Sequence, residues 1–299
     1  MRILITGCTG TLGKALVDNY SKSERATFGI RNKSKCDLQS DYHDCISVDL
    51  MNYSEVDNLD LSLFDTLIHT SWLTTPDIFW NSDVNIDWRN ASISLFERFV
   101  EFGGKRIVGI GSCAEYDWSI GLPLAEDSPV NDTSMYAKSK LEVLAWLRQQ
   151  KVEYLWLRIF FMFGGSEPYG RLIPSTIDSL LAGDNFEVQN SKTVGDFVSV
   201  ADVARVIHEL NDIPAVGVIN VGQGVGTDIS KVVSIIEQIL NKSGFVTFST
   251  SERGGNEVIS DSKKLNALLP SFRWSELDEA IRENVMLRRS VFQKIKPDS

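Results

Sequence analysis

The chain alternates between short apolar runs and helical patterns over most of its length. Seven runs rich in β-branched and aliphatic residues are typical of fully buried strands, at residues 2–6, 26–30, 45–49, 65–69, 105–111, 153–160 and 217–221. Helical patterns begin between them at residues 11, 84 and 134. Strands that alternate with helices in this way build a parallel sheet with helices on both faces. The sequence therefore predicts an α/β fold with a doubly wound parallel sheet.

Three glycines follow the first strand at every third position, in the stretch TGCTGTLG at residues 6–13. Between a strand and a helix, Gly7 permits a tight turn, Gly10 lets the backbone approach a pyrophosphate, and Gly13 lets the helix pack close to the strand. Phosphates would then face the N–H groups at the start of the helix. The loop predicts a dinucleotide site in a Rossmann-like domain.

A second lobe is indicated where the alternation stops, in a loop rich in glycine and proline. Pro174 and Gly183 bracket a helix beyond that loop. We expect a dinucleotide-binding Rossmann domain at 1–165 and a smaller C-terminal lobe, mainly for substrate binding, at 166–299. A later strand-like run implies that the chain returns to the first domain at about 194–224.

Composition excludes several classes of partner. A net charge of −10 disfavours nucleic acid and anionic membranes, which need a basic surface. There is no apolar run long enough to span a membrane and no targeting segment, so we expect a cytoplasmic protein. The 4 cysteines and 3 histidines fit no ligand spacing, and we expect no metal site.

The residues after the second strand bear on the choice of cofactor. NAD-binding domains place an acid there for the ribose hydroxyls, but this chain has GIRNKSK. Arg31, Lys33 and Ser34 offer positive charge and a hydroxyl, as a ribose 2′-phosphate requires. The sequence favours NADP(H) over NAD(H), and a solvated basic turn is the alternative. Asp49, after the third strand, is a candidate contact for the adenine amino group.

Tyr136 and Lys140 lie four residues apart, on one face of the helix predicted from residue 134. Ser112 ends the strand just before it, at the carboxyl edge of the sheet where open α/β folds bind ligands. A carbonyl reduction needs a proton donor, and an ammonium beside a phenol lowers the phenol's high pKa. Ser112 can hydrogen-bond the carbonyl oxygen. These three residues predict hydride chemistry at a carbonyl or alcohol.

Taken together, these features resemble the short-chain dehydrogenase/reductases, and more narrowly the extended branch that acts on nucleotide sugars. The residues that carry the resemblance are TGCTGTLG, LIHTSW, GSCAEY, YAKSK, LRIFFMFG, GDFVSVADVA and INVGQG, with a weaker match in RWSELDEAIREN. The resemblance implies an NAD(P)-dependent oxidoreductase that acts on CH–OH or C=O groups. It also implies a homodimer formed by helices near 84–102 and 134–150.

The resemblance also implies roles for individual residues. Ser112, Tyr136 and Lys140 would be catalytic. The cofactor would contact Tyr136, Lys140 and the residues Thr6, Gly7, Thr9, Gly10, Thr11, Leu12, Gly13, Arg31, Asn32, Lys33, Ser34, Asp49, Leu50, His69, Thr70, Ser71, Phe160 and Phe163, with Arg158 beside the nicotinamide. Candidate substrate contacts are Cys113, Arg171 and Arg253, and Glu115 and Tyr116 are weaker ones.

Departures from the family pattern reduce the number of reactions that the chain is expected to catalyse. The family's 4,6-dehydratases carry Asp and Glu after the serine, where this chain has Cys113 and Ala114, so elimination of water is disfavoured. Its epimerase-reductases carry a cysteine at the Ala114 position, and Cys113 fits a core thiol better than a substrate contact. Gly195 replaces an arginine that often binds phosphate, which leaves other small carbonyl compounds open.

Two hydride reactions and one non-catalytic role remain. The basic residues after the second strand favour reduction of the 4-keto group of a nucleotide-linked 6-deoxy sugar with NADPH. One alternative is a nucleotide-sugar 4-epimerase that retains NAD. The other is an NADP-binding redox sensor without turnover, although such sensors commonly lack the tyrosine or the lysine.

Overall fold

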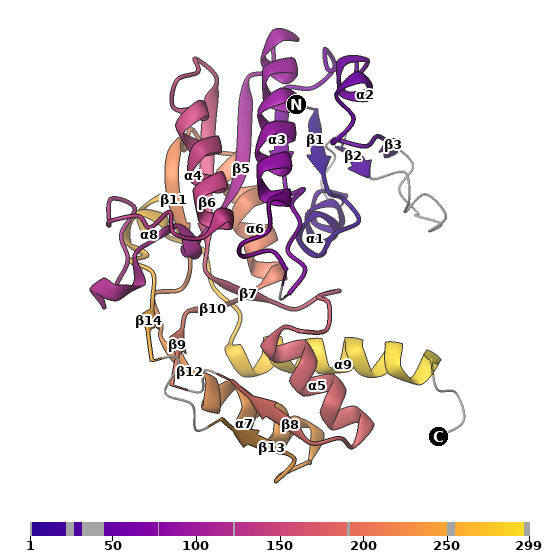
Figure 1. Cartoon of the computed structure of the whole chain (residues 1–299), viewed down its shortest axis with the longest axis vertical. Coiled ribbons are helices and arrows are strands. Elements are labelled where there is room, and N and C mark those ends of the chain that lie inside the picture. The colour runs from indigo at the N-terminus through magenta and orange to yellow at the C-terminus, as the bar shows by residue number, and fades with distance from the viewer. Residues whose placement is uncertain are drawn as a thin grey trace. The chain divides into compact units, whose positions relative to one another are not determined.

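The computed structural model describes residues 2–21, 27–31, 45–76, 78–121, 123–189, 192–249 and 255–295. The chain forms two compact units (Figure 1). The first consists of Met1–Tyr116, Pro129–Ile159 and Ala204–Ile219, and the second of Asp117–Ser128, Phe160–Val203 and Asn220–Ser299. The division into domains at about residue 165 stays a prediction.

A seven-stranded sheet forms the centre of the first unit, in the order β11-β6-β5-β4-β1-β2-β3. Its strands are β1 (Ile3–Thr6), β2 (Thr27–Arg31), β3 (Cys45–Ser47), β4 (Thr66–His69), β5 (Arg106–Ser112), β6 (Glu153–Ile159) and β11 (Gly217–Val221). The five pairings from β6 across to β3 are parallel. All seven runs expected from the sequence form strands of this sheet, which confirms the doubly wound α/β fold.

The helices and short 3₁₀ turns that the structure describes up to residue 211 include those expected to begin at about residues 11, 84 and 134. They are α1 (Thr11–Tyr20), α2 (Tyr53–Asp57), α3 (Val84–Glu101), η2 (Cys113–Glu115), η3 (Trp118–Ile120), α4 (Met135–Leu147), α5 (Leu172–Ala182) and α6 (Val200–Asn211). Helices α3 and α4 lie side by side along one face of the sheet (Figure 1). Leu95 and Phe99 of α3 and Leu144 of α4 join Leu67 and Ile107 of the sheet in one apolar core.

Gly13 is required by a close backbone approach between β1 and α1. A Cβ atom at this position would lie 2.1 Å from the carbonyl oxygen of Gly7, far inside van der Waals contact. Gly7 has a positive φ of 67°, a conformation that glycine adopts without steric cost. A Cβ atom at Gly10 would lie 3.2 Å from the Gly7 carbonyl oxygen, a tight contact that a small shift can relieve.

We expect Gly13→Ala to lower the free energy of unfolding by about 3 kcal/mol or more, because backbone has to move to admit the methyl group. Gly10→Ala is the matched control, since it adds the same methyl group to the same loop. Its unfolding temperature should stay close to that of the wild type. Thermal unfolding measures both, and a Gly13→Ala protein as stable as Gly10→Ala would contradict the close approach.

The second unit combines helices with short strand pairs. Its strands are β7 (Phe161–Phe163), β8 (Phe186–Val188), β9 (Val194–Gly195), β10 (Phe197–Ser199), β12 (Thr227–Asp228), β13 (Val246–Phe248) and β14 (Glu257–Val258), and its later helices are α7 (Ile229–Leu240), α8 (Lys263–Leu268) and α9 (Leu277–Ile295). They pair as β10-β7, β12-β9-β14 and β13-β8. Ile177 of α5, Ile236 of α7 and Ile281 of α9 meet in its core.

Helix α5 begins slightly earlier than the sequence predicts. Pro174 lies inside its first turn rather than in front of it, because a proline in the first turn removes no helical hydrogen bond. Gly183 ends the helix as expected, with a positive φ of 82°.

The GDFV motif holds three segments of the second unit together. The buried Asp196 carboxylate accepts hydrogen bonds from the N–H groups of Gln223, Gly224 and Ser260 and from the Ser260 hydroxyl. A Cβ atom at Gly222 would lie 2.6 Å from the same carboxylate, so the INVGQG turn has glycine there. These hydrogen bonds within the second unit explain why the motif has an aspartate.

Candidate active site

The glycine loop leaves the start of α1 open to an anion. Helix α1 begins after Gly10, and no side chain of the residues described caps its N-terminus. The first N–H groups of a helix favour negative charge, and Gly10 presents no Cβ in front of them. Thr9 and Thr11 are half-buried around the loop, while Leu12 points into the core. These residues fit the pyrophosphate of a dinucleotide.

A buried hydrogen-bond chain connects the glycine loop to the end of β4. The Thr6 hydroxyl oxygen accepts from the N–H groups of Thr70 and Ser71, so its proton is directed to Nδ1 of His69, 2.9 Å away. Nε2 of His69 then donates to Ser92 Oγ at 2.8 Å, and that hydroxyl donates to the carbonyl of Trp88. Burial lowers the pKa of His69 to about 3, with the charge of Lys140 acting in the same direction.

His69 is therefore a neutral imidazole with both nitrogens engaged inside the unit. It orients the Thr6 hydroxyl, which holds the backbone N–H groups of Thr70 and Ser71, and does not itself present a group to a ribose. The two residues after it remain the candidates for that contact. Thr70 is further held by its hydroxyl, which donates to the Thr6 carbonyl at 2.6 Å.

The residues expected at the adenosine end are only partly described. Arg31 ends β2, and Asn32, Lys33 and Ser34 lie outside the described residues, as does Arg253. The Asp49 carboxylate accepts the N–H of Met51 at 3.0 Å, so it caps the turn after β3. Leu50 is buried in the apolar core beneath that turn.

Tyr136 lies in the first turn of α4 because Ser134 caps this helix. Ser134 Oγ accepts the N–H of Ala137 at 3.1 Å, and the Tyr136 N–H donates to the carbonyl of Trp80 at 3.0 Å. The Tyr136 ring meets Phe79 and Trp80 edge to face, with ring centroids 5.0 and 6.0 Å apart. Its position is thus fixed by backbone and aromatic contacts, and only 8% of the residue is exposed.

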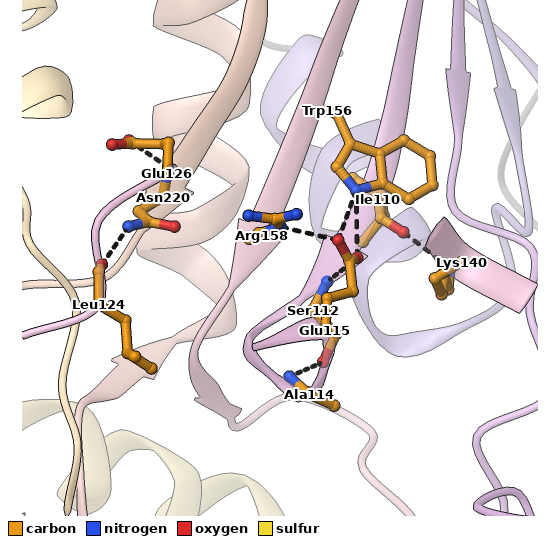
Figure 2. Close-up of polar contacts among 10 residues, drawn as sticks. All are labelled: Ile110, Ser112, Ala114, Glu115, Leu124, Glu126, Lys140, Trp156, Arg158 and Asn220. Carbon is orange, nitrogen blue, oxygen red and sulfur yellow. Dashed lines mark hydrogen bonds and ion pairs between the residues drawn. The ribbon is translucent and has the colours of Figure 1, made fainter. Parts of the chain in front are cut away.

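Lys140 lies one helical turn further on and reaches the sheet. Its Nζ donates to the carbonyl oxygen of Ile110 on β5 at 2.7 Å (Figure 2). Burial lowers the pKa of Lys140 to about 7, and the Glu115 carboxylate acts in the opposite direction. Ser112 follows Ile110 by two residues, about 7 Å along the strand. The structure therefore brings Tyr136, Lys140 and the end of β5 into one region of the first unit.

Ser112 and Glu115 form a capping box at the start of η2. The Ser112 N–H donates to Glu115 Oε1 at 2.9 Å, and Ser112 Oγ accepts the N–H of Ala114 at 3.1 Å (Figure 2). The same carboxylate accepts from Trp156 Nε1 at 3.1 Å and from Arg158 Nε at 2.7 Å. All side chains in this network come from the first unit.

This network corrects the interpretation of Glu115, Tyr116 and Arg158. Glu115 is 0% exposed and Tyr116 is 1% exposed, so neither can touch a substrate hydroxyl. The Arg158 guanidinium lies 4.3 Å from the Tyr116 ring centroid and pairs with Glu115, and it is likewise buried. A buried guanidinium needs a carboxylate partner, which Glu115 provides. The Ser-x-x-Glu spacing of a capping box is the sequence signal for the bond between Ser112 and Glu115, whereas the pairing with Arg158 has no such signal.

The remaining candidates are divided between the units. The Cys113 thiol is buried, as expected for a core position. Phe160, Phe163 and Arg171 belong to the second unit.

Burial raises the pKa of Glu167 to about 7, while its bond from the Gly164 N–H and the charge of Arg171 oppose that shift. Arg171 thus has a buried acid close by.

Comparison with known proteins identifies the family. Residues 3–222 match the model of the NAD dependent epimerase/dehydratase family. The chain belongs to this family. UDP-glucose 4-epimerase 2 of Arabidopsis thaliana is 23% identical over 306 residues, which cover 86% of each chain. This membership confirms the resemblance to the extended short-chain dehydrogenase/reductases.

Solved structures of other family members share the fold. A UDP-N-acetylglucosamine 4-epimerase from Methanobrevibacter ruminantium, in complex with UDP-N-acetylmuramic acid, superimposes with a TM-score of 0.85 at 25% identity, covering 97% of this chain and 98% of that chain. A Thermus thermophilus UDP-glucose 4-epimerase in complex with NAD gives 0.84 at 20% identity, covering 97% and 99%. None of these findings supports the expected preference for NADP(H). No helix among the described residues is long and apolar enough to cross a membrane.

Proposed function

We propose that the chain is a nucleotide-sugar 4-epimerase that retains NAD. The observation that carries this proposal is the joint placement of Tyr136, Lys140 and the end of β5 in the first unit of an NAD dependent epimerase/dehydratase. Several solved relatives hold NAD, and the Arabidopsis relative is an epimerase. The 4-epimerase alternative thus has more support than the 4-keto reductase that the sequence favours.

When bound, NAD supplies a hydride acceptor and donor. The chain's own residues manage the proton and the charge. Tyr136, as a phenolate, takes the proton of the sugar's 4-hydroxyl and later returns it to the oxygen of the 4-keto sugar. The Lys140 ammonium stabilises that phenolate, and the Ser112 hydroxyl hydrogen-bonds the reacting oxygen. Phe79 and Trp80, packed on Tyr136, exclude water from its ring.

The experiment uses purified protein without added cofactor. Its bound nucleotide is released by denaturation and identified by mass spectrometry, and a panel of UDP-sugars is tested for the C4 epimer by chromatography. We expect NAD and an epimerised sugar. Protein that holds no NAD and converts no member of the panel would contradict the proposal.

The reductase remains a second candidate because Arg31 and Lys33 follow the second strand without an acid. It predicts NADPH consumption with 4-keto nucleotide sugars and no epimer of a UDP-sugar. The redox sensor is less favoured because Tyr136 and Lys140 are both present. We also propose a homodimer through α3 and α4, which light scattering tests.

A further inference from the structure

We propose that Trp72 is a positioning residue that holds the Lys140 ammonium against its indole face. Trp72 stands in the LIHTSW stretch, directly after the end of β4. The inference deepens the proposed function and rests on it only for the effect on turnover.

The contact between the two side chains is close. Lys140 Nζ lies 3.8 Å from the centroid of the Trp72 ring, whereas it lies 5.8 Å from the Tyr136 ring and 6.0 Å from the Trp156 ring. A cation over an aromatic face within about 6 Å is attracted by the ring quadrupole, and indole is the strongest of the natural rings. Trp72 is therefore the main aromatic partner of this ammonium.

The orientation of the indole is fixed independently of Lys140. Trp72 Nε1 donates to Asn85 Oδ1 at 2.9 Å. Asn85 is fully buried at the start of α3, and its Nδ2 donates to the carbonyls of Phe79 and Ser82 at 2.6 and 2.9 Å. Trp88 stacks beside the indole at a centroid distance of 6.4 Å. A rigid support of this kind presents the ring face to the lysine without further ordering.

Trp72 also touches the proton-transferring residue itself. The rings of Trp72 and Tyr136 meet edge to face at 80°, with centroids 6.3 Å apart. The same side chain therefore adjoins both the phenol and the ammonium that controls the phenol's acidity. A change at Trp72 reaches Tyr136 through the charge of Lys140 as well as through packing.

The electrostatic surroundings make this contact consequential. Burial favours the neutral amine of Lys140, and the opposing groups are the Glu115 carboxylate from η2, the Ile110 carbonyl from β5 and the Trp72 face. His69 of β4 is neutral and adds no competing positive charge. Without the indole, more of the amine is neutral at a given pH, and the pKa of Tyr136 rises because its cationic neighbour is lost.

The test measures the pKa of Tyr136 from a pH titration of the ultraviolet absorbance of its phenolate. Each protein is titrated with and without the additional substitution Tyr136→Phe, and the difference between the two titrations belongs to Tyr136. The backgrounds are wild type, Trp72→Leu, Trp72→Phe and the control Trp88→Phe, which keeps Trp72. We expect Trp72→Leu to raise the pKa of Tyr136 by about one unit and Trp72→Phe to raise it by less. Trp88→Phe should leave it unchanged.

A pKa of Tyr136 that is the same in wild type and Trp72→Leu, or that moves equally in Trp88→Phe, would overturn the proposal. If Trp72→Leu does not fold, fluorinated tryptophan provides a second measurement, because fluorine weakens the ring quadrupole with little change of shape. Fluorination should raise the pKa of Tyr136 in the wild type and have a smaller effect in Trp72→Phe. An equal effect in both would assign it to another tryptophan and overturn the proposal.

The titration uses no sugar and adds no cofactor, and every background is titrated as purified, so its outcome does not depend on which reaction the protein catalyses. An epimerase in which Trp72→Leu leaves Tyr136 unchanged would refute only the role of Trp72. A chain that epimerises nothing but shows the expected titration would refute only the epimerase.

Discussion

Tyr136→Phe should lower the rate of epimer formation about 10²- to 10⁴-fold, because it removes the hydroxyl that takes and returns the proton. The ring contacts with Phe79 and Trp80 stay in place, so the fold and the bound nucleotide should be retained. Initial rates with the UDP-sugar found in the panel measure the first effect. Mass spectrometry of the released nucleotide measures the second.

Tyr154→Phe is the matched control for this change. Tyr154 is a partly buried tyrosine of β6 that packs against the apolar core of the first unit but has no place in the site. Its rate should equal that of the wild type. A Tyr136→Phe protein within tenfold of the wild-type rate would assign proton transfer to another group.

Glu115→Ala should destabilise the first unit by about 3–5 kcal/mol, because it leaves the buried Arg158 guanidinium without its carboxylate.

Glu115→Gln is the milder change, since its amide oxygen can still accept the Ser112 N–H. The charge that supports the Lys140 ammonium is nevertheless lost. The pKa of Lys140 then falls further below its usual value, and that of Tyr136 rises. The acid limb of the pH–rate profile should therefore move to higher pH in Glu115→Gln.

Glu153→Gln is the control, because it removes an ion-pairing carboxylate from β6, the strand that also carries Arg158. Glu153 pairs with Arg106 at 3.4 Å, but 63% of the Glu153 side chain is exposed. The buried Arg106 guanidinium also donates to the carbonyls of Leu210 and Ala215, so it keeps partners when the screened carboxylate is neutralised, and the loss should be about 1 kcal/mol or less. Chemical denaturation should show little change in its stability. Equal losses of unfolding free energy in Glu153→Gln and Glu115→Ala would contradict the role of Glu115. A pH–rate profile whose acid limb stays in place in Glu115→Gln would also contradict it.

The parts of the fold that the sequence predicts are those with local signals. Strands such as β1 and β4 are buried apolar runs, and TGCTGTLG carries the glycines that the approach of Gly13 to Gly7 requires. Tyr136, Lys140 and Ser112 follow from helical spacing and from the rule that ligands bind at the carboxyl edge of a parallel sheet. Local pattern and tertiary structure agree at these positions.

What the sequence does not predict depends on contacts between distant segments. Glu115 pairs with Arg158, 43 residues away, and only that pairing shows why the loop acid is buried rather than exposed to a substrate. Strands such as β9 and β12 have two residues each and exist through their pairing. Residues Asp117–Ser128 join the second unit although they lie between two segments of the first. None of these features has a periodic signal.

The central claim is that Tyr136 and Lys140 support removal and return of the same hydride at carbon 4 of a sugar. The most direct test supplies the UDP-sugar identified in the panel with deuterium at carbon 4, in ordinary water and without added cofactor. The account predicts an epimer that keeps its deuterium at carbon 4. An epimer that has exchanged the label for solvent hydrogen would contradict it.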